Sequence, residues 1–239
     1  MAERPILFSG PMVRALLDGR KTHTRRVVKP DAKWAARFPI CNPSGMKAGH
    51  EVWWWDGKFD RVGASQTCRY GVAGDRLWVK EAHYLTDNGD EEFAVYAADE
   101  AEVGRHLKHV ASLERAHRDI DWSRHRKLRP SIHMPRWASR LTLDITDVRV
   151  ERLQEISEAD AAAEGLMTWQ GLDCDGDPRL DGRMYHFTAW GWQKPEKETD
   201  GFMSAYAAYR DLWEAINGPG SWDANPWVWV VSFEVEPRP

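Results

Sequence analysis

Two short segments of the chain carry side chains whose types and spacing are suited to acid–base chemistry. Residues 19–25 contain Lys21 and, three positions later, Thr24. Residues 157–165 contain Glu164. A lysine amine acts as a base when burial or nearby positive charge lowers its pKa, and it can then take the proton of a hydroxyl nucleophile. The two segments therefore suggest a metal-free site made of a lysine, a threonine and a glutamate.

Lys21 has positively charged neighbours in the sequence, because Arg20, Arg25 and Arg26 lie close to it. Like charges disfavour the ammonium form, so these arginines are expected to lower the pKa of Lys21. The spacing sets one condition on this interpretation. Residues three apart on a straight strand point to opposite faces, so Lys21 and Thr24 meet only if the chain turns or bulges between them.

An amphipathic helix is predicted to end directly before Lys21. Ser9 is suited to cap this helix, Pro11 fits its first turn, and Gly19 is suited to end it. Its apolar face is predicted to contain Val13, Leu16 and Leu17. After the lysine, residues 22–28 are predicted to form a strand that ends at a proline.

A second, shorter helix is predicted to position Glu164. Ser157 is expected to cap this alanine-rich helix, with Asp160 at the third helical position reaching back to the cap. Glu164 then falls in the last turn, where the helix dipole disfavours a carboxylate by about 0.3–1 kcal/mol. A functional role would explain that placement. A solvated glutamate at a frayed helix end is the commoner arrangement and is the alternative.

Several further elements are predicted from periodicity. Alternating apolar residues predict strands over residues 76–80, 141–150 and 227–235, and helical spacing predicts helices over residues 99–120 and 202–217. Residues 31–70 are predicted to be a connection with little regular structure, because glycine, proline and asparagine occur in it together with several tryptophans. Strands interleaved with peripheral helices indicate an α+β protein built on a small, mostly antiparallel barrel.

These motifs resemble those of the ASCH family, whose members have a PUA-like barrel. The resemblance covers residues 6–28, 71–84, 129–167 and 202–235. The chain is longer than the compact ASCH enzymes and is similar to larger ASCH-like proteins of phages and prophages, which also carry a segment like Arg129–Arg140. The resemblance implies a single PUA-like domain over residues 1–239, with insertions at about residues 31–70, 85–128 and 168–200.

The resemblance also implies an activity. In small bacterial ASCH enzymes that hydrolyse N4-acetylcytidine, a lysine, a threonine three residues later and a glutamate in the later helix form the active site. By position these residues correspond to Lys21, Thr24 and Glu164. The implied function is an amidohydrolase without a cofactor or metal, acting on a modified cytidine, either free or in a nucleic acid, with RNA favoured over DNA.

Two other functions remain open at this stage. The same site would suit a non-catalytic reader that binds a modified base. Some ASCH proteins are reported to cut RNA, and in a ribonuclease His23 or His133 would be the general base. The alternatives to the amidohydrolase are therefore a non-catalytic RNA- or DNA-binding reader of a modified base and a ribonuclease.

The distribution of charge indicates a polyanionic partner. The chain has a net charge of -4, yet residues 14–37 hold eight lysines and arginines against two acids, and residues 104–140 hold ten against three. If folding brings these segments to one face, they would bind phosphates, whereas separate solvated faces are the alternative. The predicted nucleic-acid contacts are Arg20, Arg25, Arg26, Arg129, His133, Arg136, Trp137 and Arg140, with Trp137 suited to stack on a base.

The composition argues against a membrane protein, a secreted disulfide-rich protein and a zinc protein. No apolar run approaches the length of a membrane span, and the N-terminus lacks the pattern of a signal peptide, so a cytoplasmic protein is expected. The three cysteines form no paired framework, and the histidines and cysteines form no zinc motif. Asp173, Asp175 and Asp177 have the opening spacing of a calcium loop, but Pro178 and Met184 occupy positions that need glycine and glutamate.

Overall fold

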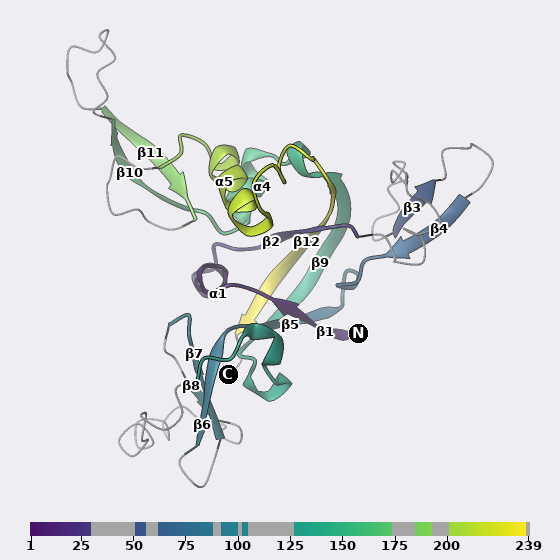
Figure 1. The fold of residues 1–239 in the computed structure, drawn as a ribbon, viewed down its shortest axis with the longest axis vertical. Coiled ribbons are helices and arrows are strands. Elements are labelled where there is room, and N and C mark those ends of the chain that lie inside the picture. Colours follow the sequence, from purple (N-terminus) through teal and green to yellow (C-terminus); the bar gives the residue numbers. More distant parts are fainter. Residues whose placement is uncertain are drawn as a thin grey trace. The chain divides into compact units, whose positions relative to one another are not determined.

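The structure is a computed structural model with many strands and few helices, so the predicted α+β class is confirmed (Figure 1). It describes residues 1–29, 51–55, 62–87, 92–99, 102–104, 127–173, 185–192 and 201–237. The chain divides into two compact units: unit 1 comprises Met1–Gly19, Tyr70–Thr146 and Phe233–Pro239, and unit 2 comprises Arg20–Arg69 and Asp147–Ser232. Among the described residues, no helix has both the length and the apolar character that a membrane crossing requires.

Unit 1 contains one part of the main sheet and the first helix. Its elements are β1 (Glu3–Leu7), α1 (Gly10–Leu17), β5 (Arg76–Lys80) and the first half of β9 (Leu141–Arg152). β1 pairs in parallel with β5, which pairs antiparallel with β9. Alternation buries one face of β5 and β9, as the sequence predicted, because Leu77, Val79, Leu141 and Leu143 are buried while Trp78 is half-buried.

α1 agrees with the sequence prediction except in two details. Val13 and Leu16 are buried as expected, but Leu17 is 42% exposed because it lies beyond the buried stripe of this short helix. Ser9 occupies the cap position, yet its side chain makes no capping hydrogen bond. Gly19 follows the helix with a φ of 70°, a left-handed conformation that favours glycine, and so ends it as predicted.

A second, three-stranded sheet in unit 1 consists of β6 (His83–Asp87), β7 (Glu92–Tyr96) and β8 (Glu102–Gly104). The helix predicted over residues 99–120 is therefore wrong at residues 102–104, and residues 105–120 lie outside the described part of the chain. Pairing of β8 with β7 along its whole length overrides the local helical spacing. Two 3₁₀ helices, η2 (Ser131–His133) and η3 (Arg136–Ala138), precede β9.

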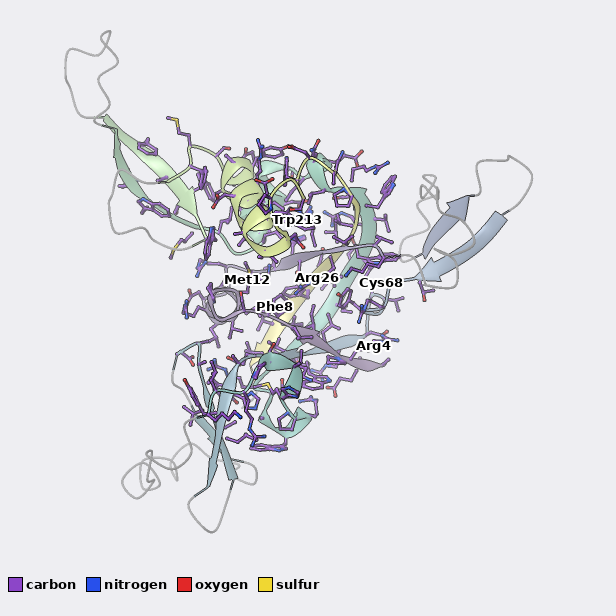
Figure 2. The ribbon with its side chains drawn as sticks, viewed as in Figure 1. Arg4, Phe8, Met12, Arg26, Cys68 and Trp213 are labelled. Carbon is purple, nitrogen blue, oxygen red and sulfur yellow. The ribbon has the colours of Figure 1, made fainter. Side chains whose placement is uncertain are left out.

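Unit 2 holds the rest of the main sheet and two helices that lie side by side (Figure 1). Its elements include β2 (His23–Val27), η4 (Leu153–Glu155), α4 (Glu158–Ala163), α5 (Ala205–Asn217) and most of β12 (Trp227–Pro237). β12 lies between β9 and β2 and pairs antiparallel with β2, where Val231 faces Thr24. The helix predicted at residues 202–217 is confirmed from Ala205 onward as α5, whereas Phe202 forms a bridge with Trp190 instead. Tyr209, Leu212 and Trp213 of α5 are buried, and Trp213 is labelled in Figure 2.

Two hairpins lie within segments that were expected to be insertions. β3 (Glu51–Trp55) pairs with β4 (Val62–Thr67), and β10 (Met167–Asp173) pairs with β11 (Tyr185–Gly191). The expectation of little regular structure over residues 31–70 is therefore wrong at both strands of the first hairpin. Three consecutive tryptophans in β3 favour a strand, and this preference outweighs the turn-forming residues around it.

The described strands form open sheets and no closed barrel. The main sheet has the strand order β1-β5-β9-β12-β2. β9 and β12 each contribute residues to both units. The PUA-like barrel and the single domain over residues 1–239 thus stay predictions.

A buried ion pair in unit 1 yields a stability prediction. Arg140 donates to both carboxylate oxygens of Glu81 at 2.9 Å and to Asp99 at 2.7 Å, and its guanidinium lies 3.9 Å from the ring centre of Tyr96. Glu81 is buried, so Arg140→Met leaves a carboxylate without its counter-ion. We expect the free energy of unfolding to fall by about 3–5 kcal/mol in urea titrations. The double variant Glu81→Gln/Arg140→Met should recover much of that loss, and an equal or larger loss would contradict this account.

Candidate active site

Lys21 and Glu164 form a buried, doubly hydrogen-bonded pair in unit 2. The amine Nζ of Lys21 donates to the main-chain carbonyl of Glu164 at 2.7 Å and to its Oε2 at 2.8 Å. The two side chains are 1% and 5% exposed. The backbones of the two residues also form an antiparallel bridge. Glu164 therefore faces Lys21 and not solvent, so the alternative of a solvated glutamate at a frayed helix end is wrong for this residue.

Helix α4 positions Glu164 for this contact. The Ser157 hydroxyl accepts from the amide of Asp160 at 3.1 Å, so the predicted N-cap is confirmed, and Glu164 is the C-cap. The amide of Thr22 donates to the carbonyl of Ala163 at 2.9 Å and holds the lysine segment at the same helix end. The carboxylate at the negative end of the helix is thereby explained, because the Lys21 amine contacts both it and the last carbonyl.

Arg25 and Tyr209 contact the other carboxylate oxygen of Glu164. Arg25 Nη1 lies 3.3 Å from Oε1, and the hydroxyl of Tyr209 donates to the same oxygen at 3.5 Å. Arg25 Nη2 donates to Asp160 at 2.8 Å and to Glu151 at 3.4 Å. The Asp160 side chain therefore binds an arginine, where the sequence had suggested that it would reach back to the helix cap.

The network continues to the surface through Arg149 on β9. Its Nη2 donates to Asp160 at 2.7 Å and its Nε donates to Glu151 at 2.5 Å. Arg25 and Arg149 thus share the same two carboxylates. Cations and anions alternate from the buried amine of Lys21 to the partly exposed Arg149.

Burial dominates the protonation behaviour of the site. It lowers the pKa of Lys21, and Glu164 opposes this effect only in part, while Arg26 and Arg25 lower the pKa further. Burial also raises the pKa of Tyr209 well above its usual value, so its hydroxyl stays protonated and can donate to Glu164. Burial lowers the pKa of the half-buried His23.

Thr24 is buried in β2, one residue before Arg25. Lys21 stands outside this strand, because the strand begins at His23 and the lysine forms an isolated bridge with Glu164. The described segment therefore contains no straight strand that starts at Lys21. Such a strand would have pointed Lys21 and Thr24 to opposite faces. The structure brings Lys21 and Glu164 into contact and places Thr24 three residues away in the adjoining strand.

The three predicted nucleic-acid contacts of unit 2, Arg20, Arg25 and Arg26, differ in burial and in the groups that they contact. Arg20 Nη1 donates to the carbonyl of Gly165 at 2.5 Å, next to the site. Arg26 is half-buried on β2 (Figure 2), opposite Trp229 of β12. Arg25 is buried among carboxylates, so in this structure its charge is used inside the protein.

The predicted contacts of unit 1 lie around η2 and η3. Arg129 and His133 are exposed, whereas Trp137 is half-buried and packs against a cluster that contains Tyr96 and Met134. Arg136 binds both carboxylate oxygens of Glu3, at 2.8 and 3.0 Å. Arg140 is also paired, as described above. A nucleic-acid groove formed together with residues 14–37 stays a prediction.

Sequence reasoning missed Arg149, Glu151 and Tyr209, and it did not predict that Asp160 and Glu164 contact Arg25. A signal for Glu151 and Arg149 was present, since both occupy the half-buried positions of β9 that alternate with the buried Val148 and Val150. An alternating pair of opposite charges on one strand face indicates a cross-element ion-pair network. Tyr209 carried no such signal, because its position on α5 is that of a core residue.

Among the residues that the structure describes, no group of three or more histidine, cysteine, aspartate or glutamate side chains is arranged to hold a metal ion. Most of the aspartate-rich segment at residues 173–184 lies outside the described part of the chain.

No protein-family model, curated protein or solved structure matches the chain. The relation to the ASCH family therefore stays a prediction from the sequence motifs.

The contact between Lys21 and Glu164 predicts a large stability effect. Glu164→Gln removes the charge that compensates the buried Lys21 and Arg25 and should lower the free energy of unfolding by about 3 kcal/mol at pH 7. The difference in unfolding free energy between the variant and the parent protein should be smaller at pH 9. The pKa of Lys21 is lowered in the folded protein and falls further without the carboxylate, so raising the pH neutralises the buried amine of the variant and removes the cost of its uncompensated charge.

Chemical denaturation at both pH values measures this effect. Glu234→Gln, at an exposed position on β12, is the matched control and should change stability by less than about 0.5 kcal/mol. Equal effects of the two substitutions would show that the Glu164 charge does not stabilise the site.

Proposed function

We propose that the protein is a metal-independent amidohydrolase that removes the N4-acyl group of a modified cytidine, free or within RNA, on a PUA-like fold. The observation that carries this proposal is the buried contact of 2.8 Å between Lys21 Nζ and Glu164 Oε2. Its support from sequence is the resemblance of the Lys21, Thr24 and Glu164 segments to those of ASCH amidohydrolases. The residues named come from two segments far apart in the chain, and two of them are in contact.

The proposed reaction begins with Lys21 in its neutral form. Its amine takes the hydroxyl proton of Thr24 while Oγ1 attacks the acyl carbonyl carbon. The C–N4 bond then breaks, and the ammonium of Lys21 gives the proton to N4, so cytidine leaves and an acyl ester remains on Thr24. Water hydrolyses this ester, releasing the carboxylic acid and restoring the hydroxyl.

The environment of Lys21 suits this role. Burial lowers its pKa, which increases the fraction of neutral amine near neutral pH. Glu164 offers a carboxylate and a carbonyl to the ammonium form, so the proton taken from Thr24 is held until N4 accepts it. The turnover rate should consequently rise with pH through the pKa of Lys21, because only the neutral amine starts the reaction.

Product analysis tests the proposal directly. The purified protein is incubated with N4-acetylcytidine, both as the nucleoside and within oligonucleotides, and the products are identified by mass. Cytidine and acetate in equal amounts would support the amidohydrolase. Cleaved strands would instead identify a ribonuclease, and tight binding without products would identify a reader; either result would contradict the proposal.

Lys21→Arg separates catalysis from binding. Arginine keeps the positive charge but does not lose its proton at any accessible pH. We expect hydrolysis to fall by at least about 100-fold, the lower scale of acid–base contributions, while nucleic-acid affinity stays within about tenfold. Lys29→Arg, at an exposed position two residues after β2, is the matched control and should hydrolyse at the parent rate. An active Lys21→Arg variant would exclude Lys21 as the base.

A further inference from the structure

Arg25 links the Lys21–Glu164 pair to the outer carboxylates of unit 2. Its side chain has no exposed surface, and its guanidinium contacts the carboxylates of Glu151, Asp160 and Glu164. One nitrogen, Nη1, faces Glu164, and the other, Nη2, faces the two outer acids. A planar guanidinium can span several acids in this way, whereas the single ammonium group of a lysine cannot.

The contacts divide the two oxygens of Glu164 between different partners. Arg25 and Tyr209 contact Oε1, while Lys21 contacts Oε2. A carboxylate held at one oxygen by two donors cannot rotate without breaking those bonds. The second oxygen is therefore kept directed at the amine of Lys21.

We propose that Arg25 is the positioning residue of this site: it fixes the orientation of the Glu164 carboxylate and places a permanent positive charge beside the Lys21 amine. Its effect on turnover rests on the proposed function, but its effect on the proton of Lys21 does not. Arg25 acts through Glu164 and the local field, and it is assigned no contact with the substrate.

The charges that act directly on Lys21 are those of Glu164, at the C-cap of α4, and of Arg25 and Arg26 on β2. The outer charges, Asp160 on α4 and Arg149 and Glu151 on β9, are connected to Lys21 through Arg25, and α5 supplies the neutral Tyr209. The half-buried His23 on β2 faces the same charges. The Arg25 charge disfavours the ammonium form of Lys21, and the outer acids partly cancel that charge. Removing Arg25 should therefore favour the protonated amine, and removing the Asp160 charge should favour the neutral amine.

The outer end of the network offers a variant that leaves the buried part in place. The side chains of Glu151 and Asp160 are 18% and 25% exposed, so water solvates them in part. Asp160→Asn keeps the shape of the side chain and the amide that donates to Ser157, and it removes only the charge. This substitution should disturb folding less than a change at the fully buried Arg25.

The experiment follows the Lys21 proton by NMR in protein labelled with ¹³C at the lysine Cε. The Lys21 resonance is assigned as the one that disappears in Lys21→Arg. We expect its titration midpoint to rise by about one pH unit in Arg25→Met, the scale of a nearby charge, and to fall by a smaller amount in Asp160→Asn, because Asp160 is connected to Lys21 through Arg25. Arg210→Met, at an exposed position on α5, is the matched control and should leave the midpoint unchanged.

Shifts of opposite sign in the two variants are difficult to produce by general loosening of the fold. Unchanged midpoints in both variants would overturn the proposal, as would shifts in the same direction. If Arg25→Met does not fold, Arg25→Gln, which removes the charge but keeps a hydrogen-bonding side chain, takes its place with the same expected rise.

Arg25→Lys separates the charge from the orientation. It keeps a positive charge near Lys21, so the titration midpoint should stay close to that of the parent protein, but it cannot hold Glu164 and the outer acids together. If the parent hydrolyses N4-acetylcytidine, kcat should fall by about tenfold or more in this variant with little change in KM. A parent without turnover would refute the proposed function, while the NMR midpoints would still test the role of Arg25.

Discussion

The buried pair of Lys21 and Glu164 is the interaction around which unit 2 is organised. An ammonium and a carboxylate removed from water are each costly, and they are retained only where good geometry and further hydrogen bonds compensate. Here the C-terminal end of α4, strand β2 and the buried face of α5 each supply part of that compensation. The cap at Ser157 sets where α4 begins, and the left-handed Gly19 ends α1 two residues before Lys21.

The same constraint explains why the site extends outward as a network of charges. Glu164 alone balances one cation, yet two cations contact it, so Arg25 needs further acids. Asp160 and Glu151 provide them, and Arg149 in turn compensates those acids nearer the surface. Charge is thereby neutralised stepwise from the interior to the solvent, and no unpaired carboxylate is left at the buried end of this network.

Local patterns predicted the elements that hold the site better than they predicted its contacts. The helix before Gly19, the capped helix at Ser157 and the period of two in β9 are encoded by neighbouring residues, and all three are present. The β3–β4 hairpin and strand β8 were missed, because pairing between segments overrode local composition. Arg25 was predicted to face nucleic acid, since its sequence neighbours do not reveal the acids that fold against it.

The amine of Lys21 binds Glu164 twice, once through the side chain and once through the main chain, and these two bonds differ in how they respond to mutation. The carboxylate is lost with any substitution except aspartate, but a carbonyl is present whichever amino acid occupies position 164. Evolutionary drift at this position would therefore remove the acid while one of the bonds that place the lysine persists. For the activity proposed above, one substitution at position 164 would thus remove the acid and still leave the lysine held in its place.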